Sequence, residues 1–236
     1  MTKQEIEVKA AEYRKIILKE KKRLEACGRY HFDDKAHIYT MDGIVVPSVT
    51  KMISTISPDL LMNSNFIRKT QIGTNTHSLS EYHIAKHMGW KGVKFPDLSD
   101  NEIVDCDKYL NGFLLFIERE PYVIIACELR VHSHKHGFAG TLDILALDSK
   151  GRLCILDIKT VAKLSPTVAL QLAGYGFLFT ETYGHLISEK VRGRSAIWLT
   201  GDNKYKLAHY TEKSDESVIL CKAISYQWDK KNGINK

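Results

Sequence analysis

The sequence lacks several features that would place the protein in other classes. No apolar run approaches the roughly 18 residues that a transmembrane helix requires, so we expect no membrane span. No C-x-x-C pair occurs, and five scattered cysteines favour neither a zinc ribbon nor a disulfide framework. The first 30 residues hold five acidic side chains and no apolar signal segment, so a cytoplasmic protein is expected. Internal repeats and low-complexity tracts are missing as well.

The composition is that of an ordinary globular chain. Its 236 residues are 44% apolar and 26% charged, with a formal net charge of +6, which favours one α/β domain with additions over a disordered protein. Residues 1–30 predict a helical extension, because apolar side chains recur there at helical spacing, and residues 31–236 predict the main domain. Lysines in this helix alternate with glutamates, which favours a solvent-exposed face over a nucleic-acid-binding arm.

Hydrophobic periodicity divides the rest of the chain into strands and helices. Short runs that are apolar on both faces predict central strands of a covered sheet over residues 122–131, 141–147 and 152–160. Spacings of three and four predict helices over residues 73–88, 100–118, 165–183 and 215–228. Two hairpins are expected, one at Asp42-Gly43 and one over residues 195–210. We therefore predict a mixed central sheet of about five strands between helices.

Helix ends are indicated by polar and proline residues. Ser48 is expected to cap a short helix that stops at Ser57-Pro58-Asp59. Asn75 or Thr76 is expected to cap the helix that begins near Gly73. Ser165-Pro166 supplies a cap followed by a proline at the first helical position, which predicts the start of a further helix.

Three carboxylates interrupt the predicted central strands. Glu128, Asp143 and Asp157 lie in apolar runs, and Lys159 follows two residues after Asp157, on the same face of its strand. Buried carboxylates are costly unless a cation compensates them, and Mg²⁺ or Mn²⁺ suits oxygen ligands. The alternative is a simple ion pair with Lys159 at the strand ends. The three acids together favour a metal site.

A shared site also fixes how two of these strands must pair. If Asp143 stands opposite Asp157, then Leu145 stands opposite Ile155 and Leu147 opposite Leu153. A four-residue turn over 148–151 would move Asp157 to the other face of the sheet, because a slip of one residue reverses every side chain. We therefore expect a turn with an odd number of residues, or a bulge.

The order of these motifs resembles that of the PD-(D/E)XK nuclease superfamily, in particular its RecB-like exonuclease branch. The motifs that carry the resemblance span residues 44–180 and are Val46-Pro47-Ser48-Val49-Thr50, Gly73-Thr74-x-x-His77, Glu128, Gly140-x-x-Asp143, Asp157-Ile158-Lys159-Thr160 and Gln171-x-x-x-Tyr175. The first is similar to a segment of mitochondrial genome maintenance exonuclease-like proteins. One departure is Ile72, since the branch places a basic residue before Gly-Thr, which leaves Arg68 or Lys69 as substitutes.

The resemblance implies a restriction-endonuclease-like fold and a role for each motif residue. Glu128, Asp143, Asp157, His77 and the Ile158 carbonyl would hold one or two Mg²⁺ or Mn²⁺ ions, and Lys159 would position water and stabilise charge on the phosphate. Gln171, Tyr175, Thr160 and Arg68 would contact DNA. An iron–sulfur cluster, present in some relatives, is not expected, because only Cys221 follows Cys154.

The implied activity is metal-dependent hydrolysis of DNA phosphodiesters by a stand-alone exonuclease, acting on single strands or ends and encoded by a phage or a bacterium. The alternative is a non-catalytic module on the same fold that binds nucleic acid or protein; protein partners are not readable from the sequence. His132, His134 and His136 alternate, but a polar loop that touches phosphate explains them better than a zinc site, since the local sequence offers no fourth ligand.

Overall fold

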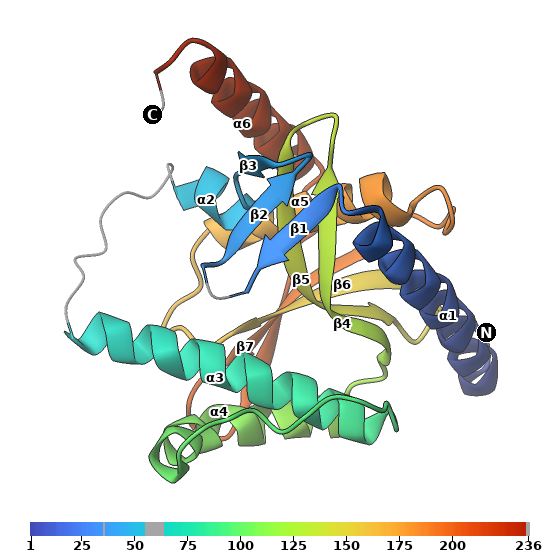
Figure 1. Ribbon diagram of the computed structural model, residues 1–236. Helices are drawn as coiled ribbons and strands as arrows, with labels where there is room; N and C mark the ends of the chain where they lie inside the picture. The colour runs from blue at the N-terminus through green and yellow to red at the C-terminus, as the bar shows by residue number, and fades with distance from the viewer. Residues whose placement is uncertain (35, 55–63, 235–236) are drawn as a thin grey trace.

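A mixed five-stranded sheet forms the centre of the molecule. The computed structural model describes residues 1–34, 36–54 and 64–234. The strands, in spatial order, are β4 (Val123–Ser133), β5 (Phe138–Leu147), β6 (Leu153–Lys159), β7 (Gly193–Leu199) and β8 (Tyr205–His209). Only β6 and β7 run parallel within this order; the other neighbours are antiparallel. Figure 1 shows helices on both sides of the sheet, which confirms the predicted α/β class.

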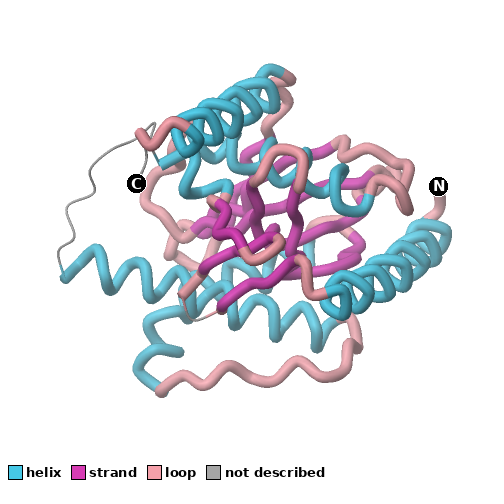
Figure 2. The backbone as a smooth tube through the Cα atoms, turned by 45° about the horizontal axis from the view of Figure 1, so that its top comes forward, coloured by secondary structure: helices cyan, strands magenta, loops and turns pink. Residues whose placement is uncertain are grey.

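Helices cover the two faces of the sheet because alternate strand residues are apolar on each face. One face, with Leu145 and Ile155, packs against α1 (Lys3–Cys27), α2 (Val49–Ser54), α5 (Thr167–Tyr183) and α6 (Ser214–Lys231). The other, with Ile144 and Leu156, packs against α3 (Ser64–His87) and α4 (Asp100–Arg119). In Figure 2 the strands occupy the centre and the helices surround them. No described helix is both long enough and apolar enough to span a bilayer.

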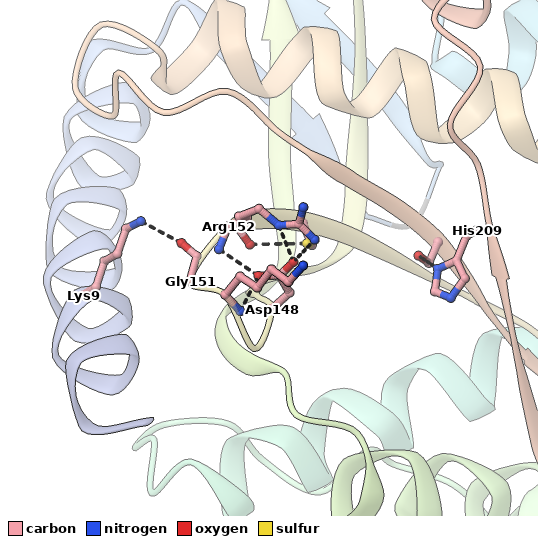
Figure 3. Close-up of polar contacts among 8 residues, drawn as sticks. Lys9, Asp148, Gly151, Arg152 and His209 are labelled. Atoms are coloured by element: carbon pink, nitrogen blue, oxygen red, sulfur yellow. Dashed lines mark hydrogen bonds and ion pairs between the residues drawn. The ribbon is translucent and has the colours of Figure 1, made fainter. Parts of the chain in front are cut away.

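The turn between β5 and β6 sets the register on which the site depends. Leu147 pairs with Leu153 and Leu145 with Ile155, so the turn comprises residues 148–152, an odd number, as predicted. The Asp148 carboxylate accepts hydrogen bonds from the backbone N–H groups of Lys150 and Arg152 and from Arg152 Nε (Figure 3). Lys9 of α1 donates to the Gly151 carbonyl at 2.7 Å, so α1 holds this turn from outside.

A second, smaller sheet lies across the first. It consists of β1 (Tyr30–Asp33), β2 (Ile38–Met41) and β3 (Ile44–Val46), all antiparallel. The predicted Asp42-Gly43 hairpin joins β2 to β3, with both residues at positive φ. Buried residues of β2 and β3 pack against Ala139 of β5, which keeps this sheet over β5 (Figure 1).

The N-terminal helix is part of the main core. Thr2 caps α1 in a reciprocal capping box with Glu5. The predicted apolar stripe is present, and Ile6, Ala10 and Ile17 are buried in the core that includes β4 and β5. The predicted helical extension is thus confirmed as a helix, while the domain boundary at residue 30 stays a prediction.

Of the three predicted helix caps, only Ser48 is confirmed: its Oγ accepts the backbone N–H of Lys51 at 3.0 Å. In α5 the cap residue is Pro166 and the helix begins at Thr167, so the predicted cap Ser165 lies one residue outside, although its Oγ accepts the Thr167 N–H at 3.2 Å. The expected stop of the short helix at residues 57–59 lies outside the described residues. By contrast, α3 begins at Ser64, so Gly73 is in mid-helix and neither Asn75 nor Thr76 is a cap.

Tertiary contact explains a glycine in the middle of α3. A Cβ on Gly73 would lie 3.2 Å from Thr160 Oγ1, so this glycine lets α3 approach the end of β6 closely. Glycine is unfavourable inside a helix by about 1 kcal/mol relative to alanine, so the sequence alone predicts the start of a helix near Gly73 instead of its middle. The close approach brings the next turn of α3 to the carboxylates.

Candidate metal centre

The three strand carboxylates form a row across β4, β5 and β6. Pairing of Cys127 with Ile144 and of Leu129 with Leu142 brackets Glu128 and Asp143, so these two stand opposite each other. On the other side of β5 the ladder with β6 ends at the pair formed by Ile144 and Leu156, which are the immediate neighbours of Asp143 and Asp157. Beyond this point the Asp143 carboxylate accepts the backbone N–H of Ile158 at 2.7 Å. The two strands thus separate at the position where the acids lie.

His77 of α3 joins this row from above the sheet. Its Nε2 lies 3.0 Å from the Ile158 carbonyl, which can only accept, so Nε2 carries the proton and donates it. In the neutral ring Nδ1 then presents a lone pair, 3.4 Å from Asp143 Oδ2. Ligand atoms of His77, Glu128 and Asp143 all lie within 4.8 Å of one another. These facing lone pairs and carboxylates would be stabilised by a cation between them.

Asp157 is the most deeply buried of the acids. It is 1% exposed, and its Oδ2 lies 2.5 Å from Lys159 Nζ, while Oδ1 accepts no hydrogen bond from any described residue. Burial raises the pKa of Asp157 to about 6; Lys159 opposes this rise and the charge of Asp143 adds to it. Burial lowers the pKa of Lys159, but the carboxylates of Asp157 and Asp143 more than offset this, so the net direction is upward and the ammonium keeps its charge.

The pKa of Glu128 is raised further than that of Asp157. Burial raises its pKa to about 9, and the charges of Asp143, Glu81 and Asp157 add to the effect. Its backbone also has a positive φ of 47°, which is uncommon for a residue other than glycine and interrupts the regular pairing of β4 with β5. A row of three acids, in which Glu128 and Asp157 have raised pKa values and Asp157 has an unpartnered oxygen, is compensated best by a divalent cation. The residues present therefore fit Mg²⁺ or Mn²⁺.

Gln171 and Tyr175 form one buried hydrogen-bonded pair. Gln171 Nε2 donates to Tyr175 Oη at 3.0 Å, and both side chains are more than nine-tenths buried. Burial raises the pKa of Tyr175 well above its ordinary value, and the nearby charges of Asp157 and Asp143 contribute. A Cβ on Gly140 would lie 2.8 Å from the Tyr175 ring, so the glycine of the Gly-x-x-Asp motif makes room for this tyrosine. A direct contact of either side chain with DNA stays a prediction.

A cleft of about 510 Å³ opens in front of the row. Its lining comes from α1, α2, α3, α5, β1, β2, β4 and β5 and includes His77, Glu128, Asp143 and Tyr175. Asp157 and Lys159 lie behind it and are not among the lining residues. Thr160 is placed beside Gly73, whereas Arg68 forms a two-pronged ion pair with Asp105 of α4 and does not line the cleft.

Glu81 and Tyr39 line the cleft but belong to none of the motifs identified in the sequence. Glu81 lies one helical turn after His77, lines the cleft, and has a pKa raised by burial. Spacing of four on one helix is a signal that could have indicated it. Tyr39 of β2 reaches the cleft through a hydrogen bond between its Oη and Thr141 Oγ1, 2.9 Å apart. The sequence offered no signal for Tyr39, because the small sheet reaches the cleft only through tertiary packing.

Comparisons with known proteins add little to this geometry. No protein-family model matches the chain, and no curated protein matches it. In structure the chain is similar to a protein named SSO0001, with 13% identity, a TM-score of 0.35, and coverage of 76% of this chain and 83% of that one. It is also similar to a Eubacterium rectale protein provisionally named an exonuclease, with 13% identity, a TM-score of 0.44, and coverage of 79% and 74%. Similarity at 13% identity and TM-scores below 0.5 gives no information on function.

Proposed function

We propose that the protein is a divalent-metal-dependent nuclease that hydrolyses DNA phosphodiester bonds, from ends or on single strands. The observation that supports this most strongly is the convergence of Glu128, Asp143 and His77 in the lining of the cleft, with the Asp157–Lys159 ion pair on the neighbouring strand β6. Carboxylates that face a polyanionic substrate would repel it unless a cation lies between them. The order of the motifs, which resembles the RecB-like PD-(D/E)XK branch, agrees with this proposal.

The cation ligands we propose are the carboxylates of Glu128, Asp143 and Asp157, a ring nitrogen of His77 and the Ile158 carbonyl. A bound Mg²⁺ or Mn²⁺ would neutralise phosphate charge and acidify a water molecule. His77 has a further task in the protein itself, because its Nε2–H group holds the Ile158 carbonyl in place. The carbonyl oxygen has two lone pairs, so this hydrogen bond leaves one available.

Lys159 supplies a fixed positive charge beside the carboxylates. Its ammonium is 18% exposed and lies against Asp157, so it is held in one position and stays protonated across the neutral range. Donors aimed at charge that develops in the transition state usually contribute a factor of about 10² to 10³ to turnover. We therefore assign Lys159 to stabilisation of the charged phosphate and to positioning of the attacking water.

End-labelled DNA tests the proposal. Wild-type protein is incubated with single-stranded and duplex DNA in Mg²⁺, Mn²⁺ or EDTA, beside an Asp157→Asn variant that keeps the shape and removes the charge. We expect cleavage with either cation, none in EDTA and none by the variant, while the variant retains DNA binding. DNA binding by the wild type without cleavage under any cation would refute the nuclease and support the non-catalytic module instead.

A further inference from the structure

A second pocket adjoins the cleft on the side of the N-terminal helix. Its volume is about 270 Å³, and it is enclosed by α1, β1, β4 and α5. Three residues, Lys21, Phe32 and Arg130, line both the cleft and this pocket, so the two are neighbouring parts of one depression. None of the residues assigned to the metal lines it. The full lining is Lys21, Leu24, Glu25, Tyr30, His31, Phe32, Arg130, His132 and Tyr183.

Aromatic rings form much of the wall. Tyr30 and His132 are stacked, with ring centroids 4.5 Å apart and planes inclined by 16°. Phe32 lies on the adjacent part of β1, and the Arg130 guanidinium sits 4.8 Å from its ring centroid. Planar rings and a guanidinium are the surfaces on which an unpaired nucleobase stacks. The pocket is slightly smaller than the roughly 300 Å³ at which small-molecule sites begin, so it has room for one planar group.

Two buried polar atoms in this wall have no partner. Among the described residues, neither Tyr30 Oη nor His132 Nδ1 makes a hydrogen bond. His132 is 6% exposed, and burial lowers its pKa to about 4, so its ring is neutral at neutral pH. Burial raises the pKa of Tyr30, which therefore keeps its hydroxyl proton. Leaving a buried polar atom without a hydrogen bond is unfavourable, and a ligand with a hydrogen-bonding edge would relieve this cost.

We propose that this pocket, which we call the base pocket, binds one unpaired nucleobase of the DNA strand whose phosphate lies in the cleft. The inference rests on the proposed function and deepens it, because a paired base cannot leave a duplex without losing its partner, so the preferred substrate is single-stranded. The rings supply stacking, and the unpartnered atoms of Tyr30 and His132 supply hydrogen bonds to the edge of the base.

Cations at the boundary between pocket and cleft fit the phosphate that links the two nucleotides. Arg130 is paired with Asp34 at 2.9 Å, but this pair uses one of the five N–H donors of the guanidinium. Lys21 forms no ion pair with any described residue and stands at the same boundary. Lys21 and Arg130 outnumber the one acid among the lining residues of the pocket, Glu25.

Binding of single-stranded and duplex DNA of one sequence tests the base pocket. Affinities are measured in EDTA, where cleavage cannot occur, for the wild type, Phe32→Leu, Tyr30→Phe and the control Phe95→Leu. Phe95 is an aromatic residue paired with Tyr82 outside both pockets, so its variant matches the chemistry of Phe32→Leu. We expect Phe32→Leu to bind single strands about 5- to 150-fold more weakly, the range of one lost base–aromatic stack. Tyr30→Phe should show a smaller loss, and Phe95→Leu none.

A second measurement needs no variant. Wild-type protein is titrated with strands in which one nucleotide at a time is abasic, and we expect a single position to weaken binding strongly. Equal binding by Phe32→Leu and wild type, an equal loss on duplex DNA, or no sensitive abasic position would each overturn the base pocket. Metal-dependent cleavage by the wild type would be unaffected by such a result. Conversely, base-dependent binding without any cleavage would refute the nuclease and leave the pocket standing.

Discussion

The Asp143→Asn substitution isolates the metal site from the fold. In the folded protein Asp143 is 8% exposed, accepts the Ile158 N–H and lies 3.4 Å from His77 Nδ1. An asparagine oxygen can still accept the Ile158 N–H, so the arrangement of β5 and β6 at the point where they separate should persist. The variant removes one charge from a row of acids, and without a cation it should be at least as stable as the wild type.

The magnitude follows from linkage between cation binding and unfolding. A cation at a hundred times its dissociation constant stabilises the folded state by about 2.7 kcal/mol. For a chain of this size that corresponds to a rise in Tm of about 5 to 11 °C, since 1 kcal/mol shifts Tm by roughly 2 to 4 °C. We expect this rise for the wild type in Mn²⁺ and its loss in Asp143→Asn at the same concentration.

Thermal unfolding in EDTA and in Mn²⁺ is the assay, with Asp107→Asn as the matched control. Asp107 is exposed on α4 and belongs to no part of the row, so its variant should keep the full rise in Tm. An Asp143→Asn protein that Mn²⁺ stabilises as much as it stabilises the wild type would refute the assignment of Asp143 to the cation. A variant that unfolds at a much lower Tm in EDTA would refute the claim of repulsion within the row.

Three further predictions concern single residues of the site. Lys159→Ala should lower the single-turnover cleavage rate about 10²- to 10³-fold with little change in DNA affinity. A variant that binds DNA weakly but cleaves at the normal rate would show that Lys159 only binds phosphate. The folded-state pKa of Glu128, about 9, lies above its ordinary 4.5, so between these pH values the folded protein keeps a proton that the unfolded chain releases. In EDTA, the free energy of unfolding measured in urea should therefore fall as pH rises from 4.5 to 9, by at most about 1.4 kcal/mol per pH unit. Glu128→Gln should make this pH dependence weaker. Gly140→Ala, whose Cβ would meet the Tyr175 ring, should lower the free energy of unfolding by about 1 to 3 kcal/mol and reduce cleavage, as urea melts and activity assays would show.

The register of the central strands was predictable because chemistry constrained it. Three acids could share a cation only if Asp143 faced Asp157, and this required an odd turn, which residues 148–152 provide. The same reasoning could not foresee that the Asp148 carboxylate would hold the turn by accepting three hydrogen bonds from Lys150 and Arg152. Nor could it foresee the support from Lys9, since that contact depends on the tertiary position of α1.

Other features were beyond the sequence because long-range packing decides them. Gly73 reads locally as a helix boundary, yet it allows α3 to approach Thr160 closely, and this contact overrides the helix propensity of glycine. The small sheet carries Tyr30 and Phe32 to the side of the cleft, although its own sequence predicts only a hairpin. His132 belongs to an alternating histidine run, but its stacking on Tyr30 depends on where β1 crosses β4.

The central claim is that carboxylates of three adjacent strands and a helix histidine hold a catalytic divalent cation. Anomalous scattering from Mn²⁺ in crystals of the wild-type protein tests it most directly. We predict one or two peaks bounded by His77, Glu128, Asp143 and Asp157, which disappear in crystals of Asp143→Asn. Saturating Mn²⁺ that gives no peak there, in a protein that still cleaves DNA, would contradict the account.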